Sequence, residues 1–256
     1  MRLRSGVVSS VGLVRQTNED SYLVRNGLYV VCDGMGGARG GEVASQMACS
    51  GLLGVDPAES GAGELLRAVK EANRAIVDRS HEHVRLHGMG TTLTAALVGD
   101  GALTLVHIGD SRAYLLHEGR LRQLTTDHSW VGEMIRRGEM TPFEASIHPY
   151  RSVITKAMGT DNDVDPDVIE VAFAPGDRLL LCSDGLSGMV PDSDIAEILG
   201  RDEEPQAIAS LLVQAALEGG GEDNVTVLVA AAVPDPDGAE PGDDSPSPDE
   251  PILGPP

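Results

Sequence analysis

Acidic residues stand at the ends of apolar runs throughout this chain. They occur in Asn18-Glu19-Asp20, Asp33-Gly34-Met35-Gly36-Gly37, Ser183-Asp184-Gly185 and Glu222-Asp223-Asn224, and Gly109-Asp110-Ser111-Arg112 has the same setting. Crowded carboxylates at strand ends are costly unless a cation neutralises them. Hard divalent cations take oxygen ligands, so the pattern predicts a Mg²⁺ or Mn²⁺ site. Because its parts run from residue 19 to residue 223, we expect one folded unit.

The charge balance fits a carboxylate-rich metal protein and argues against other classes. A net charge of −21 opposes non-specific binding to nucleic acid or to an anionic membrane. The segment Pro234–Pro256 holds seven acidic residues and no basic ones, so 33 acidic and 19 basic residues remain outside it, a charge of −14. No apolar run approaches the roughly 18 residues that a membrane span needs. The main body of the chain is therefore acidic, and we expect it to bind neither nucleic acid nor a membrane.

The cysteines and the N-terminus indicate a cytoplasmic protein. Cys32, Cys49 and Cys182 show no paired spacing, which is typical of reduced thiols in a reducing compartment. A Cys-based phosphatase needs an arginine six positions after its cysteine, and none of the three has one. Residues 1–5 lead into a strand-like segment and not into the apolar region of a signal peptide.

Hydrophobic periodicity predicts a strand-rich α+β chain. Hairpin-length separators such as Gly99-Asp100-Gly101 indicate antiparallel pairing, so a β-sandwich covered by helices is favoured over a parallel doubly wound sheet. Helices are expected at residues 42–53, 64–83, 130–137 and 206–217, and strands at residues 6–14, 20–25, 28–32, 91–98, 102–108, 112–117, 121–124, 168–173, 178–182 and 224–233.

Two segments are expected to lack regular structure. Residues 138–150 carry two prolines and read as part of a mobile flap. Pro234–Pro256 holds eight of the fifteen prolines and almost no large apolar residues, so it is expected to be disordered. The predicted organisation is a catalytic domain over residues 1–233 and an acidic, Pro-rich tail over residues 234–256.

Each motif also has an ordinary structural interpretation. Arg15 can grip two phosphate oxygens, yet Arg15, Glu19 and Asp20 also fit a surface charge cluster. Asp-Gly pairs such as Asp33-Gly34 are common turns. Asp110 is either a ligand or the partner of Arg112 across a hairpin. No single motif decides between these alternatives.

Taken in order, the motifs resemble the metal-dependent protein phosphatase family, the PPM or PP2C type, in its bacterial form. The resemblance covers nearly all of residues 5–233. Besides the acidic motifs, with Arg15 ahead of the first, the matching pieces are Gly41-Glu42-Val43-Ala44-Ser45, Met89-Gly90-Thr91-Thr92, Leu124-Thr125-Thr126-Asp127-His128-Ser129 and Ile154-Thr155-Lys156-Ala157-Met158-Gly159.

The resemblance implies a four-layer α-β-β-α sandwich with two central antiparallel sheets and two Mn²⁺ or Mg²⁺ ions at one end. In that picture Asp33 bridges both ions, the Gly34 carbonyl binds one, and Asp184 and Asp223 complete the cage. Glu19 and Asp20 act through metal-bound water. Asp110 holds a third, weaker ion together with Asp184. Arg15 orients the phosphate, and Ser152, in a flap over about residues 127–160, approaches the third ion.

The implied activity is hydrolysis of phosphoserine and phosphothreonine on proteins by a hydroxide that bridges the two metals, opposing Ser/Thr kinases. Expected partners are phosphoproteins, among them Ser/Thr kinases and their substrates, and the protein is expected to be a monomer. Met35 stands where animal relatives carry the His proposed as leaving-group acid. Two alternatives stay open: a catalytically silent binding module on the same fold, and a partner-switching regulator that dephosphorylates an anti-sigma antagonist.

Overall fold

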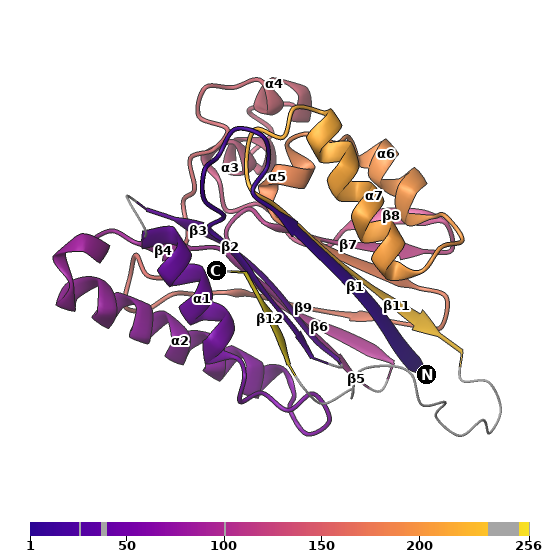
Figure 1. The fold of residues 1–256 in the computed structure, drawn as a ribbon, viewed down its shortest axis with the longest axis horizontal. Coiled ribbons are helices and arrows are strands. Elements are labelled where there is room, and N and C mark those ends of the chain that lie inside the picture. The colour runs from indigo at the N-terminus through magenta and orange to yellow at the C-terminus, as the bar shows by residue number, and fades with distance from the viewer. Residues whose placement is uncertain (26, 37–39, 100, 235–250, 256) are drawn as a thin grey trace.

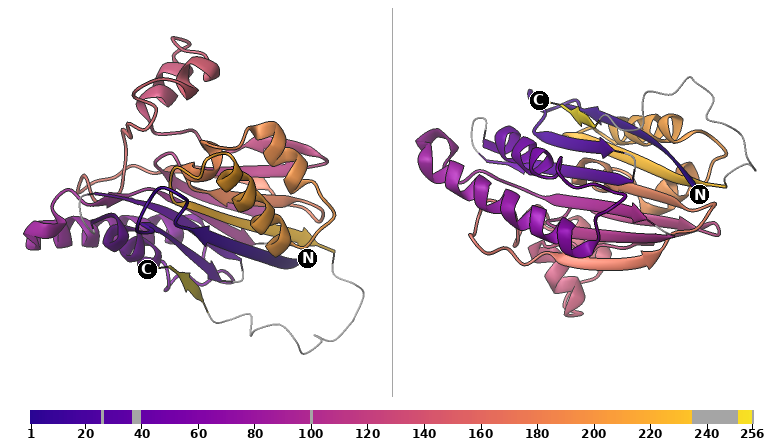
Figure 2. Two further views of the ribbon diagram at one scale, coloured as in Figure 1. Left: turned by 45° about the horizontal axis from the view of Figure 1, so that its top comes forward. Right: turned by 90° about the horizontal axis from the view of Figure 1, so that it is seen from below.

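The computed structural model describes residues 1–25, 27–36, 40–99, 101–234 and 251–255. Two antiparallel sheets lie face to face at its centre, and helices cover both outer faces (Figure 1, Figure 2). These are the layers of the predicted α-β-β-α sandwich.

Each sheet combines strands that are distant in the sequence. The five-stranded sheet is ordered β1 (Arg2–Ser10), β11 (Val225–Val233), β10 (Arg178–Cys182), β7 (Arg112–His117) and β8 (Arg120–Gln123). The seven-stranded sheet is ordered β12 (Ile252–Gly254), β2 (Asp20–Arg25), β3 (Leu28–Met35), β5 (Leu93–Gly99), β6 (Ala102–Ile108) and β9 (Asp167–Ala172), and β4 (Gly90–Thr91) pairs with β3 off this path. Adjacent strands in these orders pair antiparallel, as the hairpin-length turns predict.

The helices divide between the two outer faces. Helices α1 (Gly40–Gly51) and α2 (Ala62–Glu82) pack over the seven-stranded sheet, and α5 (Asp184–Ser187), α6 (Asp192–Leu199) and α7 (Pro205–Glu218) pack over the five-stranded sheet. A 3₁₀ turn, η1 (Val84–Leu86), follows α2, and the flap carries α3 (Trp130–Arg136) and α4 (Pro142–Ser146).

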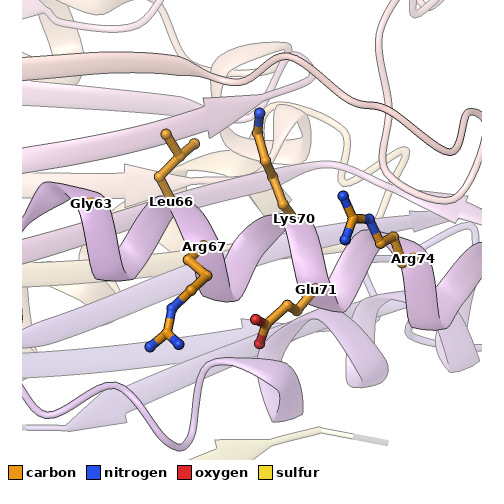
Figure 3. Close-up of a pocket in the computed structure, with 6 residues that line it drawn as sticks. All are labelled: Gly63, Leu66, Arg67, Lys70, Glu71 and Arg74. Atoms are coloured by element: carbon orange, nitrogen blue, oxygen red, sulfur yellow. The ribbon is translucent and has the colours of Figure 1, made fainter.

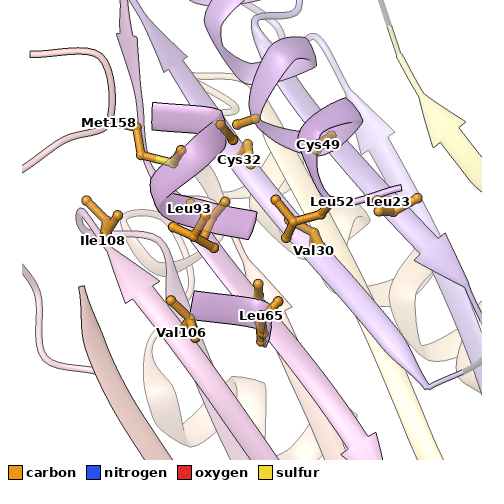
Figure 4. Packing of buried hydrophobic residues seen from close by; sticks show 14 of the residues in the cluster. Leu23, Val30, Cys32, Cys49, Leu52, Leu65, Leu93, Val106, Ile108 and Met158 are labelled. Carbon is orange, nitrogen blue, oxygen red and sulfur yellow. The ribbon is translucent and has the colours of Figure 1, made fainter. Parts of the chain in front are cut away.

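The core is mainly aliphatic, as the scarcity of aromatic residues requires. One cluster fills the space between the seven-stranded sheet and its helices (Figure 4), a second lies under α6 and α7, and a third fills the space between the sheets. Tyr29, Leu179 and Leu228 belong to this third, inter-sheet cluster and are almost completely buried. Each sheet therefore buries both faces, which explains why strands such as 178–182 read as continuous apolar runs.

Most of the predicted boundaries agree with the structure. The strands predicted at residues 20–25, 102–108, 112–117 and 178–182 have those bounds. Two predictions were wrong in part. The first strand ends at Ser10, so residues 11–14 belong to a loop, and the stretch expected to be irregular contains α4. A capping box in which Thr141 and Glu144 exchange hydrogen bonds stabilises that short helix.

The tail also differs from its prediction. Residues 235–250 and 256 lie outside the described residues, so the expected disorder there stays a prediction. Ile252–Gly254, however, forms β12 along the edge of β2, so the prediction does not hold for these three residues. Within the described ranges, no helix is both long and apolar enough to cross a bilayer.

Candidate metal centre

Five of the predicted acidic residues come together from both sheets. Asp20 begins β2, Asp33 lies in β3 and Asp110 follows β6, all in the seven-stranded sheet. Asp184 opens α5 directly after β10, and Asp223 precedes β11, so both belong to the five-stranded sheet. Burial raises the pKa of Asp33 well above its ordinary range, and the charges of the other four raise it further. The site therefore spans the junction of the two sheets.

Desolvated oxygens without partners mark this site. Burial raises the pKa of Asp20 to about 7, although a hydrogen bond from Ser183 favours the charged form. Burial, and then the charge of Asp184, raises the pKa of Asp110 to about 8. The pKa of Asp184 is also raised, first by burial and then by Asp223. Oδ1 atoms of Asp20, Asp110 and Asp184 are buried without any hydrogen-bond partner. Buried carboxylates of this kind require a proton or a cation.

The donor set consists of carboxylate oxygens, which fit a hard divalent cation. Among the described residues, no three Asp, Glu, His or Cys side chains are grouped closely enough to hold an ion alone. Mg²⁺ is commonly held through one or two carboxylates and several waters. The neighbouring carboxylates and their three unpartnered oxygens supply ligands of this kind. These oxygens are therefore ligands of the kind that Mg²⁺ and Mn²⁺ take.

Arg15 lies at the exposed side of the cluster. Its Nη2 atom donates to Asp223 Oδ2 at 2.7 Å, and this bond is the main cause of its raised pKa. The side chain of Arg15 keeps 53% of its surface exposed, so the guanidinium is accessible to an incoming anion. Glu19 is close enough to Arg15 and Asp223 for both charges to act on its pKa, which burial raises. Figure 1 shows the β1–β2 loop, which carries Arg15, beside α5.

Two glycines allow the backbone segments of the site to approach one another. A Cβ atom on Gly34 would lie 2.2 Å from the Gly41 carbonyl oxygen, so the end of β3 touches the start of α1. A Cβ atom on Gly185 would lie 2.0 Å from the Asn224 carbonyl oxygen. The Asp-Gly pairs are therefore needed for close packing and are not ordinary turns. A Gly34 carbonyl–metal bond stays a prediction.

Polar residues around the carboxylates hold them in place, and the sequence interpretation gave them no role. Ser183 Oγ donates to Asp20 Oδ2 at 2.7 Å and accepts from the Thr226 amide at 2.9 Å. Thr92 Oγ1 accepts from the Asp33 amide at 2.9 Å. The signal was present, because Thr92 and Ser183 both lie in the family-like motifs, and Thr226 follows the last of them by two residues.

Asn224 links the two motifs at opposite ends of the domain. Its Oδ1 atom accepts from the Glu19 amide at 2.8 Å, and its Nδ2 atom donates to the carbonyl oxygens of Val11 and Thr17. The loop that carries Arg15 is thereby bound to the start of β11. Asn224 was quoted with its motif, but sequence spacing alone does not show that it bridges to residue 19.

The structure argues against one of the two interpretations of Asp110, the ion pair with Arg112. Arg112 binds Asp127 through both Nε and Nη2, with Nη2–Oδ2 at 2.7 Å, so its ion-pair partner is not Asp110. Asp110 is thus left free to act as a ligand. Ser152 lies exposed in the flap, and its approach to a third ion stays a prediction.

The remaining candidates from the sequence lie elsewhere. Cys32, Cys49 and Cys182 are buried free thiols, as predicted. One surface hollow of about 290 Å³ runs along a single face of α2 (Figure 3), and its lining includes Lys70 and Arg74. It contains none of the predicted site residues. A second cavity of about 210 Å³ lies beneath β12.

The sequence of this chain matches a known protein family. Residues 14–213 match the family described as Protein phosphatase 2C. The chain is 46% identical over 235 residues to the serine/threonine protein phosphatase PstP of Mycobacterium tuberculosis, which covers 90% of this chain and 45% of that protein. It is 39% identical to the serine/threonine phosphatase stp of Listeria monocytogenes, over 85% of this chain and 91% of that protein. The chain belongs to the protein phosphatase 2C family.

A solved structure agrees with both the fold and the metal chemistry. The catalytic domain of PstP in complex with two manganese ions matches with a TM-score of 0.85 at 43% identity, over 91% of this chain and 99% of that chain. This chain spans about half the length of PstP, 45%, and most of the length of the Listeria protein.

Proposed function

We propose that this chain is a metal-dependent phosphatase that hydrolyses phosphoserine and phosphothreonine on proteins. The observation that carries the proposal is the set of three buried, unpartnered carboxylate oxygens on Asp20, Asp110 and Asp184, beside the exposed Arg15. Relatives named serine/threonine phosphatases and the manganese complex of PstP support the same assignment.

The residues divide into ligands and a phosphate-binding group. Asp33, Asp184 and Asp223, with the Gly34 carbonyl, would hold two Mn²⁺ or Mg²⁺ ions, Asp20 and Glu19 would act through water, and Asp110 with Asp184 would hold a third. Bound divalent ions supply activated water and offset phosphate charge. Arg15 orients the phosphate from the exposed side, and the forked guanidinium matches two of its oxygens. Ser183, Thr92 and Asn224 keep the ligands in position.

Asp223 and Arg15 make this division of roles testable, because the two side chains form an ion pair. The pair is at 2.7 Å and both side chains are substantially exposed, 53% and 37%, so the bond contributes at most about 1 kcal/mol. A cation held by Asp223 would compete with this weak bond, and Arg15 would then be available for phosphate.

Hydrolysis of a phosphothreonine peptide tests the proposal. Wild-type chain is expected to require Mn²⁺ and to lose activity on chelation. Asp184→Asn is expected to lose metal binding and at least about 100-fold in turnover, since a ligand is removed. Arg15→Ala should raise KM at least about tenfold while calorimetry shows Mn²⁺ affinity unchanged or slightly stronger. Undiminished turnover in Asp184→Asn would exclude the role given to Asp184.

The partners follow from the same chemistry. We propose that the substrates are phosphoproteins modified by Ser/Thr kinases, including those kinases, and that the chain acts as a cytoplasmic monomer without nucleic-acid or membrane partners. The net charge of −21 supports the exclusion of polyanionic partners. Deleting the gene and measuring phosphosites by mass spectrometry tests the substrate class, because Ser/Thr sites should gain occupancy and Tyr sites should not.

A further inference from the structure

The outer edge of β2 is covered by a segment from the far end of the chain. Residues 252–254 pair antiparallel with residues 22–24, with Leu253 opposite Leu23. Without β12, β2 would end the seven-stranded sheet. An uncovered edge presents a row of free N–H and C=O groups that binds another extended segment. The contact of β12 with β2 is visible as the small yellow strand beside the indigo one in Figure 2.

Gly254 gives the contact a side-chain requirement. A Cβ atom at this position would lie 2.4 Å from both Cζ and Oη of Tyr22, the residue opposite it. The Tyr22 ring therefore covers the glycine, and the pKa of Tyr22 is raised because its phenol is partly buried there. A larger residue in place of Gly254 would displace this ring. The edge accepts a segment with a glycine at that register.

A cavity beneath the segment supplies a second requirement. Leu253, Gly254 and Pro255 form one wall of the cavity of about 210 Å³, and Ser21 with part of α1 forms the other wall. Leu253 pairs with Leu23, which belongs to the core under α1. Since side chains alternate along a strand, Leu253 faces the helix layer and Ile252 faces the opposite side of the sheet. The docked segment therefore presents side chains to both faces of the sheet.

The docked segment also reaches the backbone of the metal centre. The single hydroxyl proton of Ser21 can go either to the Pro255 carbonyl oxygen, 3.5 Å from Oγ, or to Ser45 Oγ, 2.9 Å away. Ser45 Oγ in turn donates to the Glu19 carbonyl oxygen at 2.6 Å. The two serine hydroxyls thus lie between Pro255 and the backbone of Glu19, directly before β2 and Asp20.

We propose that the β2 edge is a strand-docking site for residues 251–255 of the same chain, and that docking braces residues 19–21, at the start of β2, in the metal centre. Eighteen residues, 234–251, separate β11 from β12, so the segment is held near the edge at high effective concentration. The docking half of the proposal is independent of the proposed function. The bracing half rests on it.

Hydrogen exchange of the intact chain in EDTA tests the docking half. Leu253→Asp, Gly254→Val and a chain ending at Pro234 should each exchange amides of residues 20–25 about tenfold faster than wild type. Val84→Asp, which places the same charge on a valine that is 85% exposed, should leave that exchange unchanged. Protection of residues 102–108 in every variant shows that the fold is intact. Equal exchange at residues 20–25 in wild type and shortened chain would overturn the proposal.

Two further measurements separate the alternatives. Sedimentation of wild type should show a monomer, and a dimer that depends on the tail would overturn the intramolecular arrangement. Calorimetry with Mn²⁺ alone should show about threefold weaker binding to Gly254→Val, as expected for loss of outer support to a ligand. Faster exchange with unchanged Mn²⁺ affinity would overturn the bracing half only. If the proposed phosphatase activity were absent, the exchange result would still decide the docking half.

Discussion

Asp20→Asn should make the metal-free protein more stable while it weakens the metal centre. Asp20 is only 1% exposed, and one of its oxygens has no partner. An asparagine has nearly the same shape, and its amide oxygen can still accept from Ser183. The substitution therefore removes a buried negative charge without removing that hydrogen bond.

The size of the effect follows from the pKa of Asp20. Its rise from 3.8 to about 7 means that the folded state binds the proton more tightly than the unfolded state. Stability is therefore lost as pH rises from 3.8 to about 7, at about 1.4 kcal/mol per pH unit. Above pH 7 the loss reaches about 4 kcal/mol, and Asp20→Asn avoids it. A chain of this size gains about 2–4 °C in Tm for each kcal/mol.

Thermal unfolding in EDTA at pH 5, 6, 7 and 8 measures this prediction. The Tm advantage of Asp20→Asn should grow with pH up to about 7 and then level off. Saturating Mn²⁺ should reverse the order, because only the wild type keeps the full set of acidic groups around the ions. A Tm for Asp20→Asn at or below that of wild type in EDTA at pH 8 would refute the reasoning from buried charge.

Three other predictions use the same stability measurement. Gly185→Ala should lower the free energy of unfolding by about 2 kcal/mol or more, because its Cβ would lie 2.0 Å from the Asn224 carbonyl oxygen. Gly63→Ala is the control: nothing lies within 4 Å of its Cβ, so it should raise the free energy of unfolding by about 0.5–1 kcal/mol through helix propensity. Equal effects would contradict the close approach. Thr92→Val should cost about 1–3 kcal/mol, since the Asp33 amide loses its acceptor, and an unchanged urea midpoint would argue against this. Mn²⁺ at 100 times its Kd should add about 2.7 kcal/mol to the wild type, and a Tm that does not respond to Mn²⁺ would exclude a site in the folded state.

The strand arrangement was largely predictable because buried strands leave a strong local signal. Runs such as 28–32 and 179–182 are apolar on both faces and are followed by polar residues, so strands of this kind are visible in the sequence. Helix α6 was missed because it has only eight residues and a largely exposed acidic face. Strand β12 has no local signal of its own. It exists through pairing with β2, and pairing partners are not encoded within a three-residue segment.

The identity of the candidate ligands was also predictable, but their support was not. Asp33 and Asp184 follow apolar runs, and that position exposes a carboxylate at a sheet end. The contacts made by Asn224 and Ser183 cross more than 40 residues of sequence and depend on the register of β11. The ion pair of Arg112 was not predictable for the same reason, because strand β8 lies between Arg112 and its partner Asp127 in the sequence.

The junction of the two sheets at the metal centre has a consequence for residues far from it. Asp20 and Asp33 belong to one sheet and Asp184 and Asp223 to the other, so the spacing between these pairs depends on how the sheets are seated. The side chains between the sheets determine how the two sheets pack against each other. Changing their bulk would alter how well the chain discriminates between ions of different radius, although none of them touches an ion. Any preference between Mn²⁺ and Mg²⁺ would thus depend on the apolar interior as well as on the carboxylates.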